Sequence, residues 1–305
     1  MKPLMDVPAL EARLAAGQRT VLLDVRWVLG DPHGRDHYLA GHLPGAVFVD
    51  LASELSDPAV PDRGRHPLPS AGQFQESARR WGIRKGDVVV AYDDSANMAA
   101  ARVWWMLRDA GLDEVYLLDG GLGAWRAAGL PVEAGPVHPA RGDVELGSGH
   151  MPVVDAGAAA AWPRHGLLLD ARAGERYRGE VEPVDPRAGH IPGALSAPTT
   201  GNVDDGGRFL SRAELRRRFE SLGVAAGRAV AVYCGSGVTA AHEVAALELA
   251  GIPAALYPGS FSEWSNRPGL PVATGPEPGA AAGENREDTG RPAGNSAGGG
   301  GTVAL

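Results

Sequence analysis

The chain is organised around the stretch Tyr233-Cys234-Gly235-Ser236-Gly237-Val238-Thr239-Ala240, which holds its only cysteine. The short apolar run 229–233 predicts a buried strand, and the apolar spacing of 239–250 predicts a helix. A strand, a glycine-rich loop and a helix in succession are typical of an α/β fold. At such a turn the loop amides and the positive helix end favour an anionic sulfur. We therefore predict that Cys234 is a reactive nucleophile rather than an inert buried thiol.

Short segments of the chain recur once each in the same order, which indicates two tandem copies of one domain. The matched segments are 23–26 with 169–172, 41–46 with 189–194, 91–95 with 232–236, and 120–125 with 259–264. The predicted organisation is a first domain at 1–130, a Gly-, Pro- and His-rich linker at 131–152, a second domain at 153–274 and a tail at 275–305. The tail lacks aromatic residues and is expected to be disordered.

Each copy alternates short apolar runs with helical patterns, which predicts a parallel sheet covered by helices on both faces. In the first copy we expect strands at 21–25, 47–49, 88–92 and 115–118, and helices at 73–81 and 98–110. Ligands of such sheets bind at the carboxyl ends of the strands. Cys234 follows one of those ends.

The duplication separates structural residues from candidates for chemistry. Residues that occur in both copies are predicted to be structural, either as strand-end salt bridges or as satisfied turn histidines; they are Asp24 with Arg26, Asp170 with Arg172, His42 and His190. Asp93 stands where the second copy has Cys234, and Gly30 stands where it has Arg176. Arginine can bind an oxyanion through two donors, so Arg176 is a candidate for substrate binding.

Composition narrows the classes of function. The net charge of −8 argues against nonspecific nucleic-acid binding. The chain contains no run of about 20 apolar residues, the length that a membrane-spanning helix needs. We recognise no signal peptide at the start and no Cys/His spacing typical of zinc. A single cysteine excludes an internal disulfide, and we expect a reducing cytoplasm.

Together, the duplication, the two Gly-His-x-Pro-Gly-Ala turns and the Cys-Gly-Ser-Gly-Val-Thr loop resemble the rhodanese family. More narrowly, the chain is similar to the two-domain thiosulfate and 3-mercaptopyruvate sulfurtransferases from about Leu22 to Trp264. The resemblance implies that Cys234 carries sulfur as a persulfide, that Arg176 binds the donor's anionic group, and that no metal or organic cofactor is used. It implies that the outer sulfur is held by Gly235, Ser236, Gly237, Val238 and Thr239.

The resemblance also bears on the substrates. The loop is similar to the mercaptopyruvate branch, because no basic residue directly follows the cysteine, and we expect 3-mercaptopyruvate to be preferred to thiosulfate. The branch's second carboxylate-binding arginine falls on Val184, with Arg187 as a nearby substitute. The implied acceptor is cyanide or a thiol, including a reduced protein thiol.

A serine-histidine-aspartate relay is proposed for the mercaptopyruvate branch, and two of its members match this sequence. Ser236 and His66 match the serine and the histidine. The acid falls on Ala52, and the nearest carboxylate is Asp50.

Two other classes of function compete with sulfur transfer. Phosphatases and arsenate reductases also place a cysteine in an anion-binding loop, but they need an arginine six residues later, where this chain has Ala240. A non-enzymatic sulfur carrier or regulatory module would share the fold and the cysteine. Turnover with a small acceptor distinguishes such a module from an enzyme.

Overall fold

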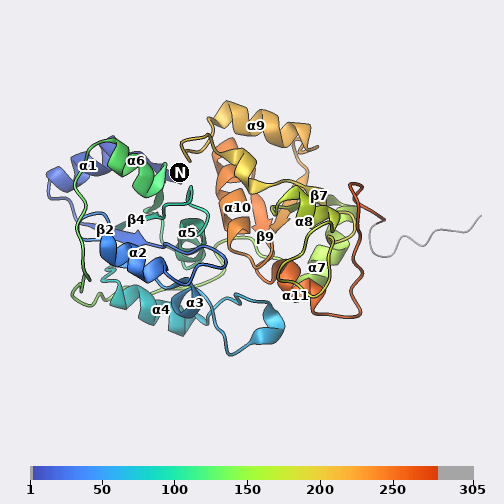
Figure 1. Cartoon of the computed structure of the whole chain (residues 1–305), viewed down its shortest axis with the longest axis horizontal. Coiled ribbons are helices and arrows are strands. Elements are labelled where there is room, and N and C mark those ends of the chain that lie inside the picture. Colours follow the sequence, from blue (N-terminus) through green and yellow to red (C-terminus); the bar gives the residue numbers. More distant parts are fainter. Residues whose placement is uncertain (1–2, 281–305) are drawn as a thin grey trace, which may run out of the picture.

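The computed structural model describes residues 3–280, which form two parallel sheets covered by helices (Figure 1). The first sheet has the order β1 (Leu4–Met5), β5 (Val115–Leu118), β4 (Val88–Tyr92), β2 (Thr20–Asp24), β3 (Val47–Phe48). The second has the order β7 (Leu195–Ser196), β6 (Gly166–Asp170), β8 (Ala229–Tyr233), β9 (Ala254–Leu256). All of their strand pairs are parallel, which confirms the predicted fold class.

Helices connect the strands, because neighbouring parallel strands need a crossover. Those of the first half are α1 (Val7–Ala15), α2 (Gly34–Ala40), α3 (Leu51–Glu54), η1 (Pro61–Arg63), α4 (Ala71–Arg80), α5 (Ala100–Asp109) and α6 (Gly121–Ala127). Those of the second half are α7 (Ala156–Ala161), η2 (Trp162–Arg164), α8 (Gly174–Arg178), η3 (Thr199–Asn202), α9 (Arg212–Ser221), α10 (Thr239–Ala250) and α11 (Ser260–Ser265).

The central strands are buried on both faces, which explains why they read as apolar runs in the sequence. Every residue of β6 is buried, and so are the last four of β8. The strands β4, β5 and β8 and the helix α10 occupy the predicted ranges. Helix α10 ends at Ala250 and is capped by Gly251, whose φ of 78° is the left-handed conformation that favours glycine at this position.

The two halves share one apolar core. Helices α5 and α10 lie side by side between the two sheets (Figure 1). Trp104 and Trp105 of α5 belong to the same buried cluster as Val244 and Leu247 of α10. Burial of this apolar surface therefore holds the first half against the helix that follows Cys234.

The strand-end salt bridges predicted from the duplication are confirmed. Arg26 Nη2 lies 2.7 Å from Asp24 Oδ2, and Arg172 Nη2 lies 2.6 Å from Asp170 Oδ2. All four side chains are buried, and each arginine also donates to a backbone carbonyl, so these charges are compensated within the fold.

The doubled histidines are also structural, as predicted. His42 and His190 are fully buried, and Nδ1 of each lies 2.9 and 2.8 Å, respectively, from the carbonyl oxygens of Tyr38 and Tyr177. Each imidazole ring also stacks on the ring of the same tyrosine.

The segment between α6 and α7 contains isolated bridges but no regular helix or strand, and it packs on the first half through the buried side chain of Val144. The first residues of the predicted tail lie against the second half, where Pro278 O accepts a hydrogen bond from Gly193 N at 2.6 Å. The rest of the predicted tail, 281–305, lies outside the described residues.

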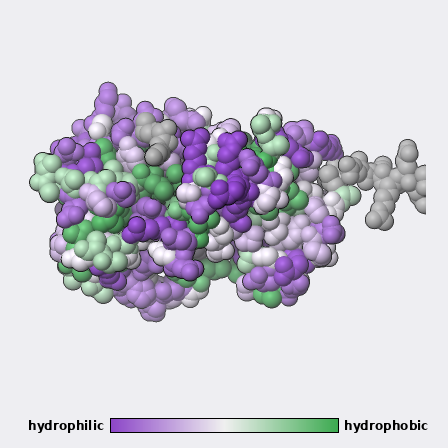
Figure 2. Space-filling view, turned by 90° about the horizontal axis from the view of Figure 1, so that it is seen from above, coloured by the Kyte–Doolittle hydropathy of each residue, from purple (hydrophilic) through white to green (hydrophobic). Residues whose placement is uncertain are grey.

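Polar side chains dominate the face shown in Figure 2, which looks onto the side of the molecule that carries α9. This helix is amphipathic: Leu215 and Phe219 are buried, and most of its other residues are exposed. Among residues 3–280 no helix has the length and apolar character that spanning a bilayer requires.

Candidate active site

Cys234 lies at the carboxyl end of β8, where the chain turns through residues 235–238 into α10. Its side chain is only 1% exposed, and residues 235–238 are buried with it. The amide of Gly237 donates to Cys234 Sγ at 3.1 Å. The loop therefore turns an N–H group toward the sulfur at the start of a twelve-residue helix, an arrangement that favours negative charge there.

Glycine is required at position 237 by both conformation and space. Its φ is 77°, and a Cβ there would lie 2.3 Å from the carbonyl oxygen of Pro258. A side chain at this position would push the loop away from the segment that leads into α11.

The start of α11 fixes the backbone of the cysteine loop. Cys234 N donates to Ser260 Oγ at 3.1 Å, Phe261 N donates to the carbonyl oxygen of Cys234 at 2.9 Å, and Ser262 N donates to that of Gly235 at 2.8 Å. Ser260 has a φ of 52°, which is unusual for a residue other than glycine. Its hydroxyl is held on both sides, because it also donates to Tyr257 O.

The corresponding loop of the first half closes around an anion. Asp93 is fully buried, and burial raises its pKa although backbone amides oppose the shift. Its two carboxylate oxygens accept hydrogen bonds of 2.7–3.0 Å from the amides of Ser95, Asn97, Ala99 and Ala100. The strand-loop-helix turn of this fold is thus a binding site for negative charge, and the first copy fills it with its own side chain.

His66 comes from the first half and reaches the cysteine loop. Its Nδ1 lies 2.8 Å from Ser236 Oγ, and the indole of Trp27 packs edge-on against its ring at 5.3 Å. Burial, with smaller effects of Arg102 and Arg65, lowers the pKa of His66 to about 4. The imidazole is therefore neutral at neutral pH and can act as a proton acceptor.

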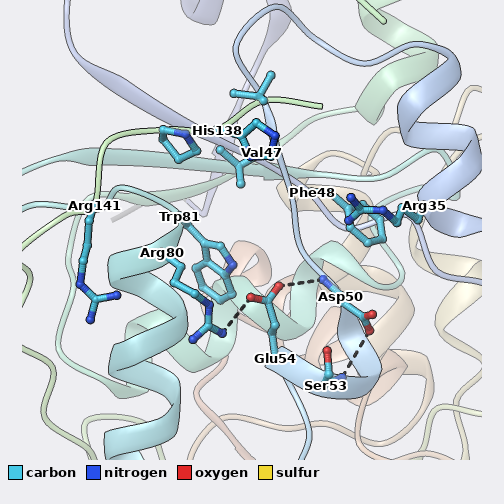
Figure 3. A pocket seen from close by; sticks show the side chains of 12 residues that line it. Arg35, Val47, Phe48, Asp50, Ser53, Glu54, Arg80, Trp81, His138 and Arg141 are labelled. Atoms are coloured by element: carbon cyan, nitrogen blue, oxygen red, sulfur yellow. Dashed lines mark hydrogen bonds and ion pairs between the residues drawn. The ribbon is translucent and has the colours of Figure 1, made fainter. Parts of the chain in front are cut away.

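Asp50, the nearest carboxylate to the expected relay position, has another role. It caps α3 by accepting a hydrogen bond from Ala52 N at 2.9 Å, and its side chain lines an open pocket of about 690 Å³ on the first half (Figure 3). Glu54, next to Asp50 in this pocket, pairs with Arg80 at 3.1 Å. The lining of this pocket includes neither His66 nor any residue of the cysteine loop.

Arg102 of α5 is a fully buried cation behind the cysteine loop. Its Nη1 donates to the carbonyl oxygen of Gly237 at 3.1 Å, and its Nη2 donates to those of His66 at 2.8 Å and Leu55 at 3.3 Å. Burial lowers its pKa to about 10, and Cys234 opposes that shift, so the guanidinium stays charged at neutral pH. One side chain of the first half thereby holds both the loop and the histidine.

Arg176, the predicted anion binder, lies on α8 and is paired with two carboxylates. Its Nη2 lies 2.6 Å from Glu182 Oε1 and 3.1 Å from Asp185 Oδ2. A Cβ built on Gly235 would lie 3.4 Å from Arg176 Nη1, so the guanidinium borders the cysteine loop as expected.

Arg65 brings a second guanidinium to the same place. Its Nη1 forms an ion pair with Asp185 Oδ1, and a Cβ on Gly235 would lie 2.9 Å from its Nη2. Its backbone amide donates to Ser262 Oγ at 3.0 Å. Arg65 and Arg176 therefore share one carboxylate beside the residue that follows Cys234.

The guanidinium of Arg187 is held by backbone carbonyl groups. Its guanidinium donates four hydrogen bonds of 2.7–2.9 Å to backbone carbonyls of Trp264, Ser265, Arg267 and Leu270. Val184, at the position of the expected second arginine, is 41% exposed and offers no charge. We therefore leave Arg187 out of the proposed anion site.

A family model described as a rhodanese-like domain matches residues 6–128 and 155–267. The chain belongs to the rhodanese family. Its two copies of the domain correspond to the two sheets, and the second carries the cysteine.

Several relatives of this rhodanese-family chain match it over most of its length. It is 48% identical to "Putative thiosulfate sulfurtransferase SseB" of Mycobacterium tuberculosis, over 89% of this chain and 97% of the relative. It is 37% identical to the 3-mercaptopyruvate sulfurtransferase of Homo sapiens, over 83% and 87% of the two chains. The crystal structure of the 3-mercaptopyruvate sulfurtransferase SseA from Escherichia coli superposes with a TM-score of 0.77 at 32% identity, over 86% of this chain and all of that one. This rhodanese-family chain is a sulfurtransferase.

Sequence reasoning missed the residues that reach the loop from elsewhere in the fold. They are Arg65, Arg102, Asp185, Ser260 and Ser262. Two of them carried a signal. Arg102 is a lone charge within the apolar run of α5, and Ser260 stands where the first copy has Gly121. Arg65 carries no pattern of its own, and its only link to the cysteine loop is that it directly precedes His66, which the resemblance pairs with Ser236.

Proposed function

We propose that this protein transfers sulfur from 3-mercaptopyruvate or thiosulfate to cyanide or a thiol through a persulfide on Cys234. The observation that supports this most is the position of the Cys234 sulfur just before α10, where it lies 3.1 Å from the backbone nitrogen of Gly237. In the equivalent loop of the first half, backbone amides bind the side chain of Asp93. This supports the proposal that the loop after Cys234 binds the outer sulfur of the persulfide through its amides.

In the first step the Cys234 thiolate attacks the transferable sulfur of the donor. With thiosulfate the sulfur-sulfur bond breaks and sulfite leaves. With 3-mercaptopyruvate the carbon-sulfur bond breaks and its electron pair stays on carbon, which then takes a proton to give pyruvate. We propose that this proton comes from the Ser236 hydroxyl, which is hydrogen-bonded to the neutral imidazole of His66.

The persulfide carries its negative charge on the outer sulfur. We propose that the loop residues Gly235, Ser236, Gly237, Val238 and Thr239 hold that atom through amides and hydroxyls. Removing one donor of this kind typically costs about 3 kcal/mol of barrier. The acceptor then attacks the outer sulfur and restores the thiolate; cyanide gives thiocyanate, and a small or protein thiol gives a persulfide.

The test replaces Cys234 with serine and measures sulfur transfer to cyanide. Because the variant lacks the nucleophile, we expect activity to fall at least about a thousandfold. In the unmodified protein, incubation with donor alone should add one sulfur atom to Cys234, measured by intact-mass spectrometry. Full transfer by Cys234→Ser, or no mass gain on the unmodified protein, would contradict the proposal.

Steady-state rates with the two donors decide the finer assignments. We expect 3-mercaptopyruvate to give the larger kcat/KM, because no basic residue directly follows Cys234. Slow release of sulfur to cyanide after rapid loading would instead favour the carrier module.

We propose the cytoplasm as the compartment, since catalysis needs the thiol reduced.

A further inference from the structure

We infer that Ser260 is a positioning residue for the chemistry of Cys234. Its hydroxyl holds the backbone amide of Cys234, and this contact is the reason that a serine stands in a left-handed backbone conformation at the start of α11. The inference rests on the function proposed above, because it concerns the nucleophile of that reaction. It adds a residue that acts through the backbone of the cysteine.

The hydroxyl of Ser260 is buried and has a fixed orientation. Ser260 is fully buried, and its Oγ donates its only proton to Tyr257 O at 2.8 Å. Because a hydroxyl oxygen also has two lone pairs, it can accept the hydrogen bond from Cys234 N at 3.1 Å. Cys234 is buried as well, so no solvent would replace the hydroxyl as the partner of this amide.

Both polar backbone groups of Cys234 are held by the start of α11. Its carbonyl oxygen accepts a hydrogen bond from Phe261 N at 2.9 Å, and its amide is held by the preceding residue, Ser260. With both groups fixed, the direction of the Cα–Cβ bond is fixed. Within residues 3–280 the amide of Gly237, at 3.1 Å, is the only hydrogen-bond partner of the sulfur. The position of the sulfur therefore depends mainly on the backbone of the cysteine.

The backbone conformation of Ser260 is unfavourable for a serine. Its φ of 52° lies in the left-handed region, where the Cβ of residues other than glycine crowds the following carbonyl group. Such conformations persist only where the surrounding structure enforces them, and they are concentrated at functional sites. A serine kept in this conformation beside a nucleophile therefore points to a function of its side chain.

The first half shows that the fold does not need this hydroxyl. Gly121 stands at the equivalent position, has a φ of 54° and begins α6 as Ser260 begins α11. The next residue, Leu122, donates to Asp93 O at 2.9 Å, which is the same backbone contact that ties α11 to Cys234. The first half thus forms the same turn with glycine, the residue that this conformation favours.

The two loops differ in how their central side chain is held. The carboxyl group of Asp93 accepts hydrogen bonds from four amides, so its position is fixed by its own oxygens. The sulfur of Cys234 accepts one. The serine is therefore found in the half where the central side chain must be held through its backbone.

The main test replaces Ser260 with glycine, the residue of the first half. We expect kcat for sulfur transfer to cyanide to fall about tenfold, with the donor KM within about twofold, because the sulfur loses its fixed position and the donor keeps its other contacts. Alkylation of Cys234 by iodoacetamide, which needs no sulfur donor, should slow by a similar factor. The urea midpoint should stay within about 0.5 M, because glycine relieves the strain while the hydrogen bond is lost.

Two further variants separate the hydroxyl from the strain. Ser260→Ala removes the hydroxyl but keeps a Cβ in the left-handed region, so we expect the same loss of kcat and a lower urea midpoint than for Ser260→Gly. Ser265→Ala is the matched control, because Ser265 is a buried residue of the same helix whose Oγ has no hydrogen-bond partner within residues 3–280. It should keep the kcat and the alkylation rate of the unmodified protein.

Three results would overturn the inference. One is a kcat and an alkylation rate of Ser260→Gly within twofold of the Ser265→Ala control. Another is a rise in the donor KM with kcat unchanged. The third is a urea midpoint lowered by more than about 0.5 M, or a failure to fold, which would make Ser260 a structural residue only. Slower alkylation of Ser260→Gly in a protein that forms no persulfide would contradict the proposed function and support the role of Ser260.

Discussion

The residues at the sulfur show how one turn serves two purposes in one chain. Asp93 and Cys234 occupy equivalent loops, and both accept hydrogen bonds from amides at the start of a helix. The carboxyl group of Asp93 fills its loop with its own oxygens, whereas in the proposed mechanism the sulfur of Cys234 gains and loses a second sulfur atom. Aspartate at this position thus lacks the thiol needed for sulfur transfer but still accepts the hydrogen bonds of the loop amides.

His66 gives the protein a dependence of stability on pH. Its pKa is about 4 in the folded protein and 6.5 when unperturbed, so between these values the unfolded chain binds more protons. Stability should therefore fall as pH decreases from about 6.5 to about 4. The loss of stability over this window is at most about 3.5 kcal/mol, at about 1.4 kcal/mol per pKa unit.

The measurement is the free energy of unfolding in urea from pH 4 to pH 8 for the unmodified protein and His66→Asn. The difference between the two should be largest above pH 6.5 and shrink toward pH 4. Glu243, whose pKa burial raises to about 7, changes stability in the opposite direction between about pH 4.5 and 7, but it does so in both proteins. A difference that is constant with pH would contradict a depressed pKa of His66.

At the scale of elements, α5 has two functions. Its tryptophans pack against α10, and its single buried arginine crosses to the cysteine loop. A helix of the first half thereby contacts the cysteine loop of the second half. The contact is a hydrogen bond to a backbone carbonyl oxygen of that loop. The first half, which has no cysteine, thus contributes a buried charge to the loop after Cys234.

Replacing Arg102 by methionine tests this support. The carbonyl oxygens of Gly237 and His66 would lose a charged donor in a buried site, so we expect a loss of about 2–4 kcal/mol of stability in urea unfolding. We also expect a lower kcat, because the loop and His66 lose a common anchor. The exposed Arg84→Met should stay within about 0.5 kcal/mol of the unmodified protein. An Arg102→Met protein as stable as this control would refute the role.

At the scale of the whole molecule, the two halves are joined through one buried apolar cluster. Their apolar cluster runs continuously from the first sheet through α5 and α10 to the second sheet. Contacts at the active site also cross between the halves, through Arg65, His66 and Arg102. The residues that contact the loop after Cys234 therefore come together only when both halves are folded.

We expect one unfolding transition for the two halves. In a urea titration, tryptophan fluorescence, far-UV circular dichroism and sulfur-transfer activity should change together, because separating the halves exposes a large apolar surface. Loss of activity at clearly lower urea than the change in circular dichroism would indicate that the halves separate before they unfold.

Much of this protein was determined by local sequence pattern. The apolar runs at β4, β5 and β8, the helical spacing of α10 and the duplicated segments predicted the fold class and the position of Cys234 at a strand end. These features depend on residues that are neighbours in the chain, and periodicity alone reveals them. The relation of Asp93 to Cys234 was visible for the same reason.

Only the tertiary structure decided which distant side chains surround the sulfur. Arg65 and Asp185 are separated by 120 positions, and Arg102 and Gly237 by 135, yet each pair is in contact. Arg187 was expected as a nearby substitute for the arginine missing at Val184, but its guanidinium donates to backbone carbonyls of 264–270. A charged residue has no period that indicates its partner, so only the packing of the two halves brings Arg65 and Arg102 to the loop that follows Cys234.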